Sequence, residues 1–180
     1  DSFYYYVRPE VVIEEMPENT IEGINVINDN TTILCLYAPY KEYAFAIGDF
    51  SNWEVDNEFY MKQTPDGKHF WVELNNLEPN KEYIFQYFVD GELLIGDPYA
   101  EKTSDPWNDH YITESIYPGI LPYPEGKTSG IATVFSTTEE EYNWNITDFN
   151  RPDPQDLIIY ELLIRDFTSE HTYQSLIDTI

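Results

Sequence analysis

Short runs of β-branched and aromatic residues recur along the first hundred residues, and turn-forming residues separate them. The clearest turns are Asn28-Asp29-Asn30, residues 64–68 and Asp90-Gly91, each placed between two apolar runs. Such turns reverse the chain tightly, because Gly and Asn tolerate the backbone angles that a hairpin requires. Strands that recur about every 8–12 residues are typical of two antiparallel sheets packed face to face. The pattern therefore predicts a β-sandwich. Its strands are expected at residues 10–14, 21–27, 31–37, 43–47, 59–63, 69–74 and 82–89.

Residues 101–155 differ from the first hundred. Prolines punctuate this stretch at positions 106, 118, 122, 124, 152 and 154, and only residues 131–135 suggest a strand. A long irregular segment is uncommon inside a closed domain. We therefore interpret this stretch as a connector that packs between two domains.

The final residues change character again. Residues 157–164 are almost continuously apolar, as in a strand that is buried on both faces of a parallel sheet. Residues 172–180 then begin a helical pattern, with Leu176, Ile177 and Ile180 on one side. A single strand–helix unit cannot bury its own strand, whereas a (β/α)8 barrel repeats this unit eight times.

The predicted fold class is thus all-β: an immunoglobulin-like β-sandwich, an irregular connector, and the first strand and helix of an incomplete (β/α)8 barrel. The predicted boundaries are 1–103 for the sandwich, 104–155 for the connector and 156–180 for the start of the barrel. A chain that stops after one barrel strand is not expected to catalyse a reaction by itself.

The charge of the chain excludes several partners. Nine Lys and Arg face 34 Asp and Glu, which gives a formal net charge of −25. A surface of that sign repels phosphates, so we expect neither a nucleic-acid partner nor binding to an anionic membrane surface. No run approaches 18 apolar residues, so no membrane span is predicted. The compartment stays open, with a secreted, periplasmic or cell-surface location favoured over the cytoplasm.

Cysteine and histidine are too few to build a metal centre. The single cysteine, Cys35, lies in a run that reads as a buried strand, and the three histidines are scattered. One thiol cannot form an intrachain disulfide, and these residues show no metal-ligand spacing. We therefore predict no metal site and no cofactor.

Three segments, taken in order, resemble the N-terminal part of α-amylase superfamily enzymes (glycoside hydrolase family 13), of the pullulanase and branching-enzyme kind. Residues 46–53 (Ala-Ile-Gly-Asp-Phe-Ser-Asn-Trp) are similar to a hairpin of the glycogen- and starch-binding module called carbohydrate-binding module family 48. Residues 85–91 and 96–100 resemble a second hairpin of that module. Residues 156–168 look like the opening strand of the catalytic barrel.

This resemblance implies an accessory part of an enzyme that hydrolyses or transfers α-glucosidic bonds. Retaining chemistry needs a nucleophilic carboxylate and an acid, which in the family come from later barrel strands. No residue here matches them, so no catalytic residue is assigned, and Asp166 is interpreted as a structural ion pair or loop contact. The implied partners are an α-glucan or malto-oligosaccharide and the enzyme's own barrel.

The resemblance also points to candidate binding residues. Trp53 matches the tryptophan that stacks on sugar, Asn52 beside it could bond to hydroxyls, and Gln86 stands where the family has a lysine. A second tryptophan of the family is replaced by Leu93 and Leu94. Half of the sugar platform is thus missing, and the alternative for Trp53 is a plug packed under its own hairpin.

Two further aromatic residues, Trp107 and Tyr99, are predicted interdomain contacts, because aromatic side chains at a domain junction commonly anchor such contacts. Three functions remain open from the sequence. The chain is a mainly structural accessory domain with weak glucan binding, an independent starch- or glycogen-binding module, or an immunoglobulin-like spacer. The spacer alternative leaves residues 156–180 unexplained.

Overall fold

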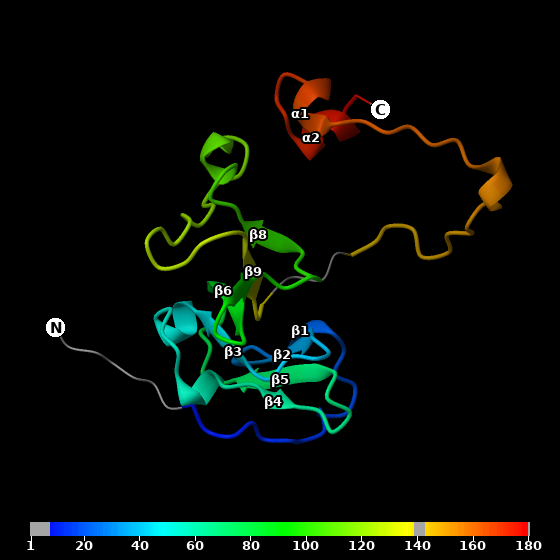
Figure 1. Ribbon diagram of the computed structural model, residues 1–180. Coiled ribbons are helices and arrows are strands. Elements are labelled where there is room, and N and C mark those ends of the chain that lie inside the picture. Colours follow the sequence, from blue (N-terminus) through cyan, green and yellow to red (C-terminus); the bar gives the residue numbers. More distant parts are fainter. Residues whose placement is uncertain (1–7, 139–142, 180) are drawn as a thin grey trace. The chain divides into compact units, whose positions relative to one another are not determined.

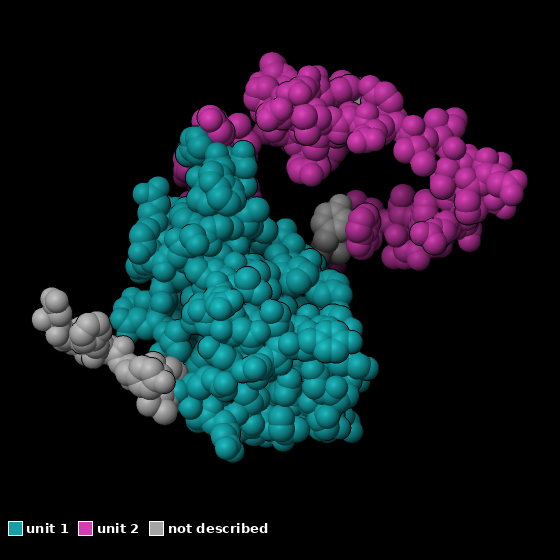
Figure 2. Space-filling view, viewed as in Figure 1, with its two compact units in different colours: residues 1–110, 121–139 teal, residues 111–120, 140–180 magenta. Residues whose placement is uncertain are grey.

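The structure is a computed structural model that describes residues 8–138 and 143–179. The chain divides into two compact units, residues 1–110 with 121–139 and residues 111–120 with 140–180 (Figure 2). The first unit contains both β-sheets, and the second contains two short helices. Each unit is described by itself below.

The first unit is built from two antiparallel sheets (Figure 1). The four-stranded sheet has the order β1 (Gly23–Asn28), β2 (Thr31–Tyr37), β5 (His69–Leu74) and β4 (Lys62–Gln63). The five-stranded sheet has the order β3 (Ala44–Gly48), β6 (Glu82–Val89), β9 (Ala132–Ser136) and β8 (Lys102–Ser104), and β7 (Leu93–Ile95) also pairs with β6. The prediction of a sheet-rich sandwich is therefore confirmed.

The core lies between the two sheets and follows the period-2 alternation of strand side chains. In β6, residues Tyr83, Phe85, Tyr87 and Val89 face this core, and Ile84 belongs to a different cluster. The four-stranded sheet contributes alternate residues of β2 and β5. These residues are Leu34, Leu36, Phe70, Val72 and Leu74. Aromatic pairs stabilise the core beyond the burial of apolar area, and the rings of Phe85 and Phe135 form such a pair, edge to face at 5.5 Å between centroids.

The sandwich extends past the boundary that the sequence suggested at residue 103. Strand β9 pairs with both β6 and β8, so residues 132–136 belong to the five-stranded sheet and not to a connector. Strand β8 (Lys102–Ser104) spans the predicted boundary, and all three of its residues pair with β9. The predicted strand at 10–14, in contrast, is reduced to one bridge between Ile13 and Gln63.

The second unit does not form the strand that was predicted at residues 157–164. Residues 157–163 have no regular secondary structure, and Ile158 is 98% exposed and Ile159 84% exposed. Two short helices follow, α1 (Ile164–Phe167) and α2 (Tyr173–Ile177). Helix α2 lies inside the range that was predicted as helical. The described residues also form four short 3-10 helices: η1 (Asp49–Ser51), η2 (Asn57–Phe59), η3 (Asp109–Tyr111) and η4 (Pro154–Asp156).

Candidate functional site

Trp53, the predicted sugar-stacking residue, is buried in the first unit. Its side chain is only 8% exposed and packs with Ile84, Ala132 and Val134, with Leu121 against them. Its indole Nε1 donates to Asp49 Oδ1 at 3.0 Å. Stacking on a sugar requires an accessible ring face, which this side chain does not offer. The structure corrects the predicted role, because the indole is the plug that the sequence left as the alternative.

Asp49 ties this plug to the sheet. Its Oδ1 accepts from the indole of Trp53, and its Oδ2 accepts from the backbone N–H of Ile84 at 2.8 Å. Asn52 is exposed and lies in the left-handed region at φ 53°. Asn52 is therefore accessible to a hydroxyl, but the indole that it was predicted to assist is not.

Gly48 lets this hairpin lie flat on β6. A Cβ built on Gly48 would stand 2.4 Å from the carbonyl oxygen of Ile84 and 2.9 Å from Cα of Phe85. Because these contacts are backbone, they cannot rotate away. We expect Gly48→Ala to lower the free energy of unfolding by about 1–3 kcal/mol, measured by urea denaturation. Gly67→Ala is a control without steric contact, because nothing lies within 4 Å of a Cβ built there. Its φ of 71° adds backbone strain in the variant. Gly48 lies in extended backbone at φ 176°, so only the control carries left-handed strain, and a loss in Gly48→Ala no larger than that in Gly67→Ala would contradict the contact at position 48.

Gln86, the second predicted ligand residue, is fully buried and holds a loop of its own chain. Its Nε2 donates to the carbonyl oxygens of Ser129 and Ile131, each at 2.9 Å, and its Oε1 accepts from the hydroxyl of Thr128. Every polar atom of the side chain thus has a partner, and none faces a ligand. This finding corrects the predicted role, because Gln86 fastens the loop that covers the Trp53 side of the sheet.

Gln86→Leu is expected to lower the free energy of unfolding by about 1–3 kcal/mol, because buried hydrogen bonds are lost and two carbonyls need new partners. Cleavage by a nonspecific protease should increase within residues 121–131. Gln155→Leu, at an exposed position in η4, provides the control. Unchanged stability and unchanged cleavage in Gln86→Leu would contradict a fastening role.

The two predicted interdomain residues are both exposed. Tyr99 is 58% exposed, and its hydroxyl donates to Glu22 within the first unit. Trp107 is 60% exposed, and its backbone N–H donates to Asp105 at 2.8 Å. Their contacts with another domain stay a prediction.

A buried polar link that sequence analysis missed lies beside Tyr99. The hydroxyl of Tyr87 donates to Asp97 Oδ2 at 2.7 Å, and Asp97 Oδ1 accepts from the backbone N–H of Tyr99 at 2.7 Å. Burial raises the pKa of Asp97 and raises the pKa of Tyr87 well above its usual value. Beyond it, Glu22 Oε1 lies 3.2 Å from Nε2 of His69. This chain of contacts connects the two sheets.

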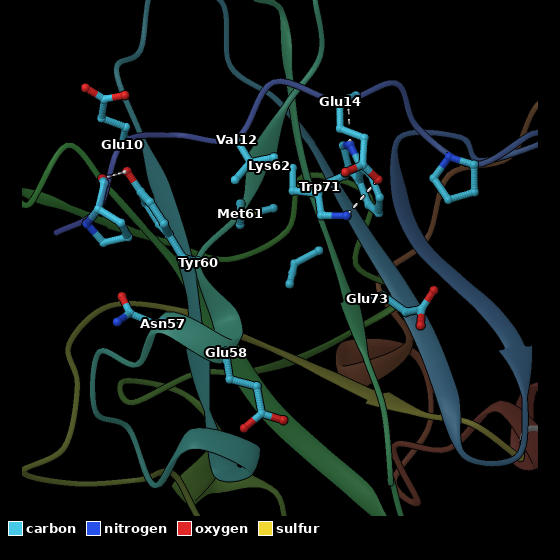
Figure 3. A pocket seen from close by; sticks show the side chains of 13 residues that line it. Glu10, Val12, Glu14, Asn57, Glu58, Tyr60, Met61, Lys62, Trp71 and Glu73 are labelled. Carbon is cyan, nitrogen blue, oxygen red and sulfur yellow. Dashed lines mark hydrogen bonds and ion pairs between the residues drawn. The ribbon is translucent and has the colours of Figure 1, made fainter.

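An open groove lies on the four-stranded sheet (Figure 3). It has a volume of about 570 Å³, between residues 9–17 on one side and η2, β4 and β5 on the other. Figure 3 shows the carboxylates of Glu10, Glu14, Glu58 and Glu73 around it. Sequence analysis missed this groove, because residues 10–14 were read as an ordinary strand.

The polar contacts inside the groove limit what it can bind. Lys62 Nζ lies 2.7 Å from Glu14 Oε1 and 4.4 Å from the centre of the Trp71 ring, which is 4% exposed. The Tyr60 ring stacks on Phe45 at 4.4 Å. One face of the Trp71 ring is therefore covered by Lys62, and one face of the Tyr60 ring by Phe45. Four carboxylates against one lysine favour a neutral or cationic ligand and oppose an anion.

Across residues 8–138 and 143–179, no group of three or more His, Cys, Asp or Glu could hold a metal ion. Burial raises the pKa of Cys35 to about 12, so this thiol stays protonated and behaves as a small apolar side chain. Within the same residues, no helix is long and apolar enough to cross a membrane.

No family model matches the sequence, and no curated protein matches it.

Proposed function

We propose that this chain is the N-terminal accessory part of an enzyme acting on α-glucans, in which the β-sandwich serves mainly as a structural flank of a catalytic barrel. Three segments support the proposal by their resemblance to family 13 enzymes, at residues 46–53, at residues 85–91 with 96–100, and at residues 156–168. The burial of Trp53 and Gln86 supports a structural role over a sugar-binding one, because both of these candidate binding side chains make contacts within the chain itself.

The observation that carries the proposal is the apolar run at residues 157–163. Most of its side chains are exposed in the second unit, Ile158 almost completely. An exposed run of this length costs free energy in water, at about 25 cal/mol per Å² of apolar surface. A sheet that covers the run on both faces would remove this cost, and a barrel strand is such an environment.

The test uses the protein as its source makes it. An endogenous product with a mass far above 21.2 kDa, which releases reducing ends from starch, glycogen or pullulan, is the expected result. A native product of 21.2 kDa without activity on any of these polymers would overturn the proposal.

The groove in Figure 3 favours the alternative of an independent glucan-binding module. Its carboxylates and Asn57 could accept hydrogen bonds from sugar hydroxyls, and its wall includes Tyr60. Titration calorimetry with maltoheptaose separates the two functions. The structural proposal predicts no binding heat, whereas heat that is lost in Glu58→Gln and kept in Trp107→Ala would establish the module.

A further inference from the structure

Two edges of the sandwich are covered by other parts of the chain. At β4, the N–H of Gln63 donates to the carbonyl of Val12, and the N–H of Glu14 donates to the carbonyl of Gln63, each at 2.9 Å. At β3, the N–H of Met61 donates to the carbonyl of Ala44 at 2.9 Å. Covering an edge in this way prevents the strand from pairing with another chain.

Strand β8 is protected differently. It is only three residues long, and it carries Lys102, whose ammonium contacts Glu82 at 2.5 Å. A short edge strand with a lysine is another common protection against pairing. The edge strands β3, β4 and β8 therefore each have a recognisable safeguard.

Strand β1 has little such protection. It is six residues long, contains no charged residue and pairs with β2 on one side. Among the described residues, the side chain of Asn25 bonds to the backbone of Ile21 and Gly23, and no backbone group pairs with the outer side of residues 24–27. Val26 is 48% exposed and Ile27 56% exposed. One irregularity of register, between Val26 and Asn28, limits the regular stretch to residues 23–26.

A slot with both apolar and acidic walls opens directly beside this edge. It has a volume of about 400 Å³ and is lined by residues of β1 and of β9, together with the chain around Tyr99. Its apolar walls include Ile24, Val26 and Val134. The slot lies where β8 ends, because Lys102 is opposite Val134 and β9 continues to Ser136 without it. A strand added at this place would gain backbone hydrogen bonds and bury alternate side chains.

Charge selects the kind of strand that fits. Glu22 and Glu101 line the slot, and Glu22 already contacts His69 and Tyr99. A second copy of this chain would bring another charge of −25 toward the slot, which opposes self-association. A basic segment would instead be attracted.

We propose that the β1 edge and its slot form a docking site for an extended segment of a partner protein, with alternating apolar side chains and at least one Lys or Arg. The segment adds as a strand beside residues 23–26, its apolar side chains enter the slot, and its cation lies near Glu101. This interaction is independent of the enzyme proposed above, because neither the Trp53 hairpin nor residues 157–163 take part.

The test is a peptide titration followed by amide NMR and hydrogen exchange on the full chain. The probe is a capped Lys-Val-Thr-Val-Lys-Val peptide, which is expected to bind with a Kd on the order of 1 mM. It should slow amide exchange within residues 23–28. A peptide with Glu in place of Lys should bind about tenfold more weakly, and a peptide N-methylated at alternate residues should not bind.

Val26→Lys is expected to abolish the binding, because it places a charge at the mouth of the slot. Val12→Lys is the matched control, with a side chain of similar exposure, 53% against 48%, in a different groove. Perturbation away from β1, or equal binding of the Lys and Glu peptides, would overturn the proposal. A dimer that forms without peptide and dissociates in Val26→Lys would also overturn it, and would make a second copy the occupant.

Discussion

Trp53→Ala is expected to lower the free energy of unfolding by about 3–5 kcal/mol, which is the range for removing a buried large aromatic side chain. The variant would leave a cavity beside Ile84 and Val134 and would remove the hydrogen bond from the indole of Trp53 to Asp49. Urea denaturation monitored by circular dichroism measures this loss. Any glucan affinity of the folded variant should equal that of the parent, because the indole is not a surface group.

Trp107→Ala is the matched control, since this indole is 60% exposed and the same atoms are removed. We expect the free energy of unfolding to change by no more than about 0.5 kcal/mol. If both variants lose the same stability, Trp53 is not the plug. If Trp53→Ala is as stable as the parent and loses binding to maltoheptaose, Trp53 contacts the sugar and its role as a plug is overturned.

The Trp53 hairpin illustrates what a sequence can and cannot predict. The resemblance of residues 46–53 implied a hairpin, and in the structure the chain turns at Asn52, which has the left-handed backbone that asparagine tolerates. Whether the indole faces solvent depends on Leu121, which lies 68 positions later and packs against it. No local pattern encodes a contact of that separation.

The same reasoning explains the boundary error at residue 103. Strand β9 is only five residues long and stands alone between proline-rich segments, so its period was too short to place it in a sheet. Strand β9 pairs with β6, which lies about fifty residues earlier in the chain. Such a pairing depends on the topology of the sheet and not on local strand propensity. Gln86 could have indicated this return, since a polar residue facing away from the core in a central strand needs a partner.

The run at residues 157–163 shows the opposite limit. Its composition strongly predicted a buried strand, yet the structure leaves it without regular secondary structure. A strand forms only when neighbours complete its hydrogen bonds and cover its faces. Among the described residues, no strand pairs with this run, and most of its side chains stay exposed. The run therefore has a high strand propensity but does not form a strand.

Asp97→Ala is expected to lower the free energy of unfolding by about 3 kcal/mol, the second-largest effect among these variants. Two hydrogen bonds to a charged or partly charged carboxyl are lost, and the fully buried hydroxyl of Tyr87 is left without its acceptor. Tyr87→Phe removes the hydroxyl together with its need for a partner. The double variant should therefore lose less than the sum of the single variants, with a coupling of about 1 kcal/mol or more. Additive losses would show that the two groups do not act as a pair.

Asp97→Asn distinguishes the charge from the hydrogen bonds. Burial raises the pKa of Asp97, so the folded protein holds this proton more tightly than the unfolded chain. The contribution of Asp97 to stability should therefore decrease as the pH rises from the usual aspartate range through the raised folded pKa.

An asparagine can keep a contact with Tyr87 and Tyr99 without this penalty. The stability of Asp97→Asn relative to the parent should thus increase with pH across that window, measured by urea denaturation between about pH 3 and pH 7. A difference that decreases with pH would mean that hydrogen bonds to the carboxylate outweigh its burial, and that Tyr87 and Tyr99 hold Asp97 as a stabilising charge between the sheets.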